Sequence, residues 1–195
     1  GAGPLLSIVV DDASPQAARE ELAGFSADER GRVLLIEQAN GGPGSARNRA
    51  LDALPADVGA VAYLDSDDWW GPAHLARARA ALARGFDVYL ANWIPVESEI
   101  DAYTHFEKLE LTQHPAIAGL EATHAFAGSF FEQELTRPIG RLSTMVLDRA
   151  RFGDLRFATE LRTAFEDRLY RLELARRSPS IAFSTRVECF SGQGI

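Results

Sequence analysis

Short apolar runs alternate with helical segments through the first 91 residues, and this alternation constrains the fold more than any other feature. Strands separated by helices at this spacing form right-handed crossovers, and repeated crossovers build a mostly parallel central sheet flanked by helices. The predicted fold class is therefore α/β. We expect buried strands at Leu5–Val10 and Ala60–Leu64, further strands at Val33–Glu37 and Asp87–Ala91, and helices at Gln16–Phe25 (with Ser14 as N-cap), Ser45–Leu54 and Pro72–Arg84.

The second half of the chain is less regular. Residues Asn92–Phe131 have poor periodicity, which predicts irregular structure or short helices. A strand is expected at Ser143–Leu147, and short closing strands at Ile181–Phe183 and Val187–Phe190. A helix at Thr163–Arg177 would bury one apolar face formed by Phe165, Leu169, Leu172 and Leu174. No repeat or linker is visible, so we expect one domain over residues 1–195.

Composition excludes several classes of protein. The 195 residues are 46% hydrophobic and 25% charged, as in globular domains. A net charge of −8 argues against nucleic acid as a partner. Cys189 stands alone, which excludes an internal disulfide and a thiolate metal cluster. No transmembrane segment is expected, and the expected location is the cytoplasm, including the inner face of the membrane. His74 lies in an alanine-rich helix and is expected at the surface.

The third apolar run ends in the acidic segment Asp65-Ser66-Asp67-Asp68. Carboxylates this close repel one another unless a cation or a group of hydrogen-bond donors offsets their charge. Hard oxygen ligands suit Mg2+ or Mn2+ and leave coordination positions for phosphate oxygens. The alternative is an acidic turn that caps the helix starting near Pro72, and the segment alone leaves both open.

A glycine-rich loop precedes the second helix, at Asn40-Gly41-Gly42-Pro43-Gly44. Such a loop at a helix N-terminus presents backbone N–H groups to an anion. Arg47, on the first helical turn, adds a charged donor. The alternative is a tight connection between strand and helix, without a ligand.

Two further acidic pairs stand at the borders of predicted elements. Asp11 and Asp12 end the first strand, where they could accept N–H donors of a nucleobase or ribose hydroxyls, or cap the following helix. Glu166 and Asp167 open the long helix. They could favourably face the helix dipole, or one could act as a general base in a cleft.

Together, three stretches resemble glycosyltransferase family 2: Val9 to Pro15, Asn40 to Asn48, and Tyr63 to Trp70. The stretch Arg156 to Arg162, leading into Phe165-Glu166-Asp167, resembles the region around that family's Glu-Asp motif. The resemblance covers about Ile8 to Leu90 and Ile139 to Ala175. It implies an inverting enzyme of the GT-A fold that uses a nucleotide-diphospho-sugar donor.

Carried over residue by residue, the resemblance implies that Asp67 binds Mn2+ or Mg2+, with Asp65 assisting through the metal or the ribose. Asp11 and Asp12 would face the base or ribose of the donor, and the loop at Gly42 and Arg47 would contact the donor. Asp167 would be the catalytic base, with Glu166 as the substitute candidate. The acceptor would be a glycan, a lipid or another hydroxyl compound.

One departure from the family concerns the N-terminus. Residues Gly1–Pro4 lead almost directly into Leu5, so the usual first strand is expected to be missing, and the chain resembles a trimmed catalytic core. Within it, residues 1–91 would form the nucleotide-sugar-binding half and residues 92–195 the acceptor-side half. Two alternatives remain: a non-catalytic GT-A-like module that binds a sugar or a partner, and a sugar nucleotidyltransferase.

Overall fold

The structure is a computed structural model, and it describes residues 5–95, 97–105, 109–162, 164–177 and 179–192. The predictions for residues 1–4 and for Thr163 thus lie outside the described residues. The chain divides into two compact units. The first unit comprises Gly1–Val58 with Asp154–Tyr170, and the second comprises Gly59–Gly153 with Arg171–Ile195.

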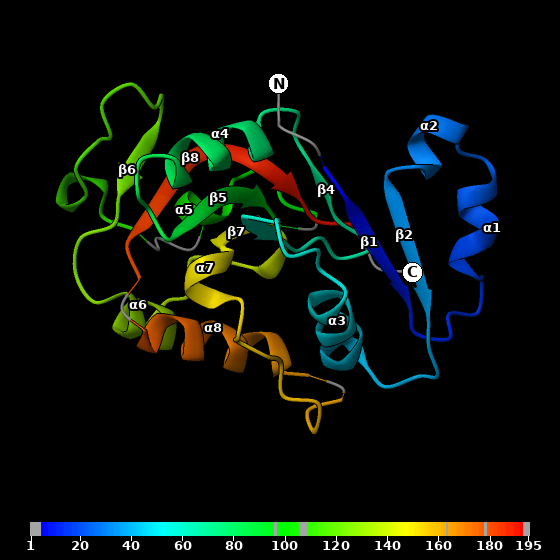
Figure 1. The fold of residues 1–195 in the computed structure, drawn as a ribbon. Coiled ribbons are helices and arrows are strands. Elements are labelled where there is room, and N and C mark those ends of the chain that lie inside the picture. The colour runs from blue at the N-terminus through cyan, green and yellow to red at the C-terminus, as the bar shows by residue number, and fades with distance from the viewer. Residues whose placement is uncertain (1–4, 96, 106–108, 163, 178, 193–195) are drawn as a thin grey trace. The chain divides into compact units, whose positions relative to one another are not determined.

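The first unit is built on a small parallel sheet (Figure 1). Strands β1 (Ser7–Asp11) and β2 (Val33–Glu37) pair in parallel, with Ser7 opposite Val33 and Asp11 opposite Glu37. The other elements are α1 (Ala18–Ala23), α2 (Ala27–Arg30), α3 (Pro43–Asp52) and the first turn of α8 (Glu166–Arg176).

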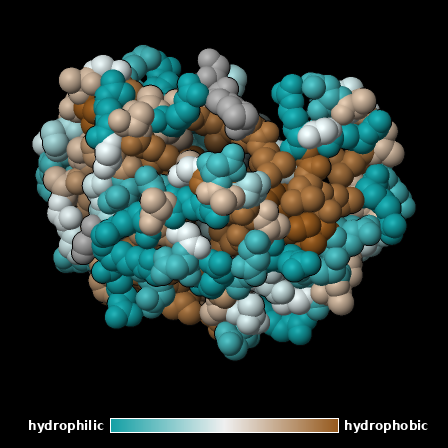
Figure 2. All heavy atoms as spheres, viewed as in Figure 1, coloured by the Kyte–Doolittle hydropathy of each residue, from teal (hydrophilic) through white to brown (hydrophobic). Residues whose placement is uncertain are grey.

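Both strands of this sheet are only partly buried, so the prediction of a buried strand at Leu5–Val10 was too strong. Figure 2 shows hydrophobic side chains gathered on the surface over β1 and β2, and Leu34 is 39% exposed. Helix α1 is shorter than predicted, and Ser14 is not its cap. The N-cap is Ala17, which has no capping side chain. The Asp11 carboxylate takes the place of a capping side chain, because this carboxylate accepts the backbone N–H of Ala18.

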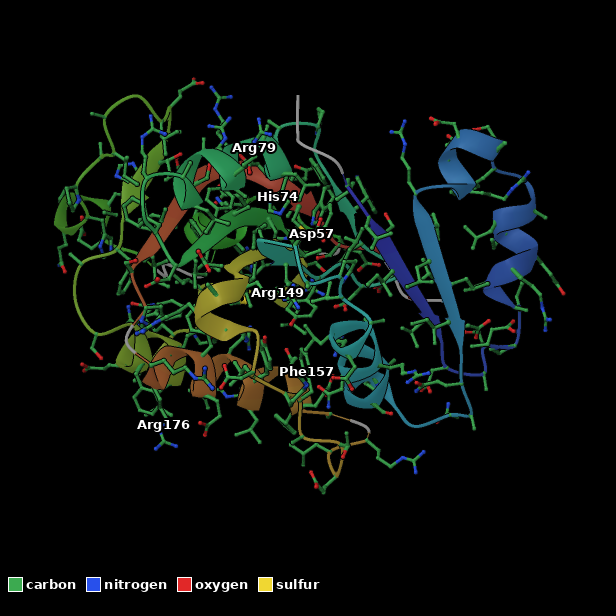
Figure 3. All side chains as sticks on the ribbon, in the orientation of Figure 1. Asp57, His74, Arg79, Arg149, Phe157 and Arg176 are labelled. Atoms are coloured by element: carbon green, nitrogen blue, oxygen red, sulfur yellow. The ribbon has the colours of Figure 1, made fainter. Side chains whose placement is uncertain are left out.

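Helix α3 packs against the later segment of the first unit. It begins with Gly42 as N-cap and Pro43 in the first turn, where a missing N–H costs nothing. Phe157, labelled in Figure 3, is buried and stacks on Tyr170 of α8 with a centroid separation of 4.0 Å. The Asn48 side chain of α3 bonds both the N–H and the carbonyl of Phe157, at 2.8 and 2.9 Å. These contacts fix the chain that leads into α8.

The second unit contains a six-stranded sheet with helices around it. Its strands are β3 (Ala60–Ala62), β4 (Trp69–Trp70), β5 (Val88–Ile94), β6 (Thr123–Ala125), β7 (Met145–Asp148) and β8 (Ile181–Phe190). Its helices are α4 (His74–Leu82), α5 (Ala102–His105), α6 (Phe130–Thr136), α7 (Arg149–Phe152) and the rest of α8, with 3-10 turns at Leu111–Gln113 and Leu142–Thr144.

The alternation of elements predicted a mostly parallel sheet, but this sheet is mixed. The order is β3-β7-β5-β8-β4, with β6 also paired to β8. Only β5 and β8 pair in parallel among these described strands, and the other pairs are antiparallel. Strands β3 and β5 do run in the same direction, as a crossover through α4 requires. However, β7 lies between them and is antiparallel to both.

The core of the second unit surrounds β5, whose first six residues are all buried. Helix α4 covers β5, where Ala78 and Ala81 pack with Tyr89 and Ala91 (Figure 1). His74, predicted at the surface, is fully buried in this layer. It lies there because its Nδ1 is 3.4 Å from the carboxylate of Glu188, and its ring lies 5.0 Å from that of Trp70.

Two other expectations for the second half need correction. The two short closing strands form one strand, β8, whose pairing with β5 shifts register around Asn92. Helix α8 buries only part of the predicted face: Leu174 is buried, whereas Phe165 is 68% and Leu169 39% exposed. Its buried positions include Glu166, Tyr170 and Leu174, which recur every four residues. Among the described residues, no helix is long and apolar enough to cross a bilayer.

Candidate functional site

Asp12 organises the glycine-rich loop of the first unit. Its carboxylate accepts the backbone N–H groups of Gly41 and Gly42, both at 2.8 Å, and the amide of Gln38 at 2.7 Å. Burial by itself would raise the pKa of Asp12, but the donors from Gly41, Gln38 and Gly42 outweigh it and lower that pKa. Asp12 is therefore an ionised acceptor at neutral pH.

This arrangement bears on the two interpretations of the loop. The anion in contact with the N–H groups of Gly41 and Gly42 is the protein's own carboxylate. Gly42 adopts a φ of 86°, and a Cβ there would lie 3.1 Å from the carbonyl oxygen of Arg162. The glycine thus serves a tight connection. Contact of Gly42 with a donor phosphate stays a prediction.

Asp11 is buried and engaged with its own loop. Its carboxylate accepts the N–H groups of Ser14 and Ala18, both at 2.8 Å. These backbone hydrogen bonds, that of Ser14 first, lower the pKa of Asp11. Of the two roles that the sequence left open for Asp11, this geometry shows the capping of the following helix. A contact of Asp11 with the donor stays a prediction.

Arg47 is paired with Glu166. The guanidinium lies 2.8 Å from a carboxylate oxygen of Glu166, in a pair whose side chains are 19% and 8% exposed. It also lies over the ring of Phe157, 5.4 Å from the centroid. This ion pair ties helix α3 to the first residue of α8. The predicted contact between Arg47 and the donor stays a prediction.

Asp167 follows Glu166 in the first turn of α8 and is only partly buried. The residue before the pair, Phe165, has a positive φ of 71°, a conformation that costs a non-glycine residue free energy. The chain therefore enters α8 through a strained turn.

The acidic segment of the second unit forms a turn rather than an extension of β3. The strand ends at Ala62, and the N–H of Asp68 donates to the carbonyl of Asp65 at 3.1 Å. Asp65 and Asp67 are partly exposed. Asp68 does not cap the next helix, since α4 has Ala73 as N-cap without a capping side chain. We call residues Asp65–Asp68 the acidic turn.

Asp68 differs from its neighbours because its carboxylate is fully buried. One of its oxygens lies 3.6 Å from the guanidinium of Arg141, and the other accepts the N–H of Gly192 at 3.3 Å. Ser143, close to Arg141 in sequence, holds the turn from the same side. Its hydroxyl accepts the N–H of Asp65 at 3.0 Å, and its carbonyl accepts the indole N–H of Trp70 at 2.6 Å.

The acidic turn alone supplies only some of the ligands that a divalent cation needs. No group of three or more His, Cys, Asp or Glu side chains within the described residues is arranged to hold a metal ion. Mg2+ is commonly held by one or two carboxylates, with phosphate oxygens and water completing its shell. Two partly exposed carboxylates on one turn, Asp65 and Asp67, match that donor set.

A cavity of about 560 Å3 lies in the second unit, lined mostly by residues of the segment 92–131 that has no regular pattern in sequence, together with Arg137 and Thr185. A volume of this size is typical of small-molecule sites. Its lining residues are mostly polar: Asn92, Asp101, Tyr103, Thr104, Leu109, Glu110, Leu111, Arg137 and Thr185.

Sequence reasoning missed Gln38, Arg141 and Ser143. Gln38 reaches Asp12 across 26 residues, and Ser143 reaches Asp65 across 78. Nothing in the local pattern marks these residues, because each acts on a segment distant in sequence.

Comparison with known proteins places this arrangement in a family. The sequence profile of Glycosyl transferase family 2 matches residues 7–140. The chain belongs to this family, and the recognition from the three acidic and glycine-rich stretches is confirmed.

Similarity to individual proteins supports the same family and fold. The succinoglycan biosynthesis protein ExoW of Rhizobium meliloti (strain 1021) is 33% identical over 192 residues, which are 96% of this chain and 59% of ExoW. The chain thus spans about three fifths of that relative. The crystal structure of S. aureus TarS 1-349 has a TM-score of 0.66 at 20% identity, covering 97% of this chain and 51% of TarS. The same TarS fragment in complex with UDP gives 0.64 at 22% identity, covering 96% and 51%. The expected GT-A fold is confirmed.

Proposed function

We propose that this chain is the catalytic core of an inverting glycosyltransferase that moves a sugar from a nucleoside diphosphate to an acceptor hydroxyl. The observation that carries the proposal is an acidic turn with two accessible carboxylates, in a chain of Glycosyl transferase family 2. This is the donor chemistry that a metal-bridged diphosphate requires.

Asp67, assisted by Asp65, would hold Mn2+ or Mg2+. When bound, the metal would neutralise the charge that develops on the diphosphate leaving group, without a proton transfer. Asp12 contributes by fixing the glycine-rich loop, so that Gly42 and Arg47 keep one conformation on the donor side. Asp11 does the same for the loop that follows β1.

Asp167 is our candidate for the catalytic base. The neighbouring Glu166 is buried and paired with Arg47, so its carboxylate is already engaged. Asp167 is more exposed and can take the proton of the acceptor hydroxyl as its oxygen attacks the anomeric carbon. Attack on the side opposite to the leaving group inverts the configuration at that carbon.

The comparisons suggest substrate classes. The TarS fragment is described in complex with UDP, so we propose a uridine diphosphate sugar as the first donor to test. ExoW is described as a succinoglycan biosynthesis protein, which favours a glycan acceptor. The 560 Å3 cavity supports an acceptor-side role for residues 92–195, with residues 1–91 on the donor side. We propose that the protein acts in the cytoplasm, including the inner face of the membrane.

Calorimetric titration with nucleoside diphosphates in Mn2+ tests the donor and metal sites. Wild-type protein should bind one diphosphate in a metal-dependent manner, and Asp67→Ala should abolish the metal dependence. Asp57→Ala, which removes an exposed carboxylate of a loop (labelled in Figure 3), is the matched control and should bind normally. Unchanged metal and nucleotide affinity in Asp67→Ala would show that the metal site is wrongly assigned.

Product analysis separates the alternatives. A glycosyltransferase releases a nucleoside diphosphate, and Asp167→Asn should stop that release while nucleotide binding is kept. A sugar nucleotidyltransferase would release pyrophosphate instead. Binding without turnover, using a donor and acceptor panel, would favour a non-catalytic module.

A further inference from the structure

Arg141 stands out among the residues around the acidic turn. It lies 73 residues after Asp68 in sequence, yet its guanidinium is the cation that approaches the buried Asp68 carboxylate. The segment that carries it is fixed against the turn. Ser143 bonds Asp65 and Trp70, and the Arg141 N–H donates to the hydroxyl of Thr144 at 3.0 Å. The backbone of this segment is therefore held beside the acidic turn, within reach of the Arg141 side chain.

The pairing of Arg141 with Asp68 is incomplete. Their nearest nitrogen and oxygen are 3.6 Å apart, which is too long for a hydrogen bond, and that Asp68 oxygen has no hydrogen-bond partner among the described residues. A guanidinium that served only this carboxylate could form two short, parallel hydrogen bonds. Arg141 instead donates from one terminal nitrogen to the hydroxyl of Ser191.

The Arg141 side chain is 37% exposed, whereas the Asp68 carboxylate is 0% exposed. A guanidinium has five N–H donors in a planar fork that matches phosphate oxygens. Donors of this kind therefore remain accessible from solvent beside the acidic turn.

Charge balance favours an anionic ligand for these donors. Asp65, Asp67 and Asp68 carry three negative charges, and a bound diphosphate would add more. A single divalent cation cannot neutralise all of them, so a further cation beside the turn would stabilise the bound donor.

We propose that Arg141 binds the donor diphosphate, with Asp68 holding the guanidinium in place. This inference rests on the proposed function, since it assumes a nucleoside diphosphate at the acidic turn. It assigns Asp68 a positioning role distinct from the metal-binding role of Asp67.

The test compares a nucleoside diphosphate with the monophosphate of the same base, by calorimetry, for wild type, Arg141→Gln and Arg141→Lys. The diphosphate is the one that wild type binds most tightly, and both titrations are made with Mn2+ and with a chelator. Arg141→Gln should weaken diphosphate binding roughly tenfold or more, with a much smaller effect on the monophosphate. Arg141→Lys keeps the charge but loses the planar set of donors, so its diphosphate affinity should lie between those of wild type and Arg141→Gln. It decides the case if Arg141→Gln does not fold.

The matched control is Arg186→Gln, because the Arg186 guanidinium pairs with Glu121 at the surface. It should leave both affinities unchanged. A lowered melting temperature in Arg141→Gln with unchanged diphosphate affinity would reduce the Arg141–Asp68 contact to a structural ion pair and overturn the inference. Equal weakening for both nucleotides would also overturn it. If wild-type protein binds no nucleoside diphosphate, the proposed function falls and this inference with it.

Discussion

Replacing Arg47 by methionine tests how the first residue of α8 is held. Methionine keeps an unbranched apolar side chain over the ring of Phe157 but removes the guanidinium. The carboxylate of Glu166, 8% exposed, then loses the cation that lies 2.8 Å away. The protein must either keep a poorly solvated charge or shift the start of α8 toward water.

The structure allows the cost to be worked out. Removing one partner of a fully buried ion pair costs about 3–5 kcal/mol. Because the Arg47 side chain is 19% exposed, some water can replace it, which places the expected loss near the lower end. The lost contact with the Phe157 ring adds about 0.5–1 kcal/mol. We therefore expect Arg47→Met to lower the free energy of unfolding by about 3.5–4 kcal/mol and the melting temperature by roughly 7–16 °C.

Urea denaturation at neutral pH measures this change, with Arg156→Met as control. Arg156 pairs with Asp52 at 2.9 Å in the same unit, but those side chains are 41% and 59% exposed. Such a pair contributes at most about 1 kcal/mol. The double variant Arg47→Met/Glu166→Leu should recover most of the loss, since it removes both charges. Equal, small losses in Arg47→Met and Arg156→Met would refute the reasoning.

Other changes have equally defined outcomes. Gly42→Ala should lower the free energy of unfolding by about 1–3 kcal/mol in denaturation experiments, because a φ of 86° strains alanine, whereas Gly59→Ala, with open space around its Cβ position, should change it by less than about 1 kcal/mol. The folded-state pKa of Asp12 lies below its usual 3.8, so its ionised form stabilises the protein fully above that pH and progressively less as the pH falls below it. Asp12→Asn should thus be less stable than wild type at neutral pH, and a series of melts should show the difference shrinking below about pH 4. Constant stability differences down to pH 2 would contradict this. Thr104→Trp should fill part of the 560 Å3 cavity and raise the KM for the acceptor without changing donor affinity. The control Thr136→Trp, on the exposed side of α6, should alter neither the acceptor KM nor the donor affinity. An unchanged acceptor KM in Thr104→Trp would show that the cavity is not part of the acceptor site.

Local sequence determined the elements with strong, self-contained signals. The strand Val33–Glu37 was predicted with its observed bounds, because an apolar, β-branched run between polar turns needs no distant partner to define it. The glycine-rich loop, the acidic turn and the Glu166-Asp167 pair were identified by residue type and order. Their succession sufficed to recognise the family.

Tertiary structure decided which groups meet. The mixed sheet arises because β7, from late in the chain, inserts between β3 and β5, and no local pattern encodes that pairing. Burial of His74 depends on Glu188, which is 114 residues away. The same holds for the partners of Asp12, Glu166 and Asp68. Hydrogen bonds and ion pairs depend on distances of a few ångström, and only the folded chain brings these distant side chains that close.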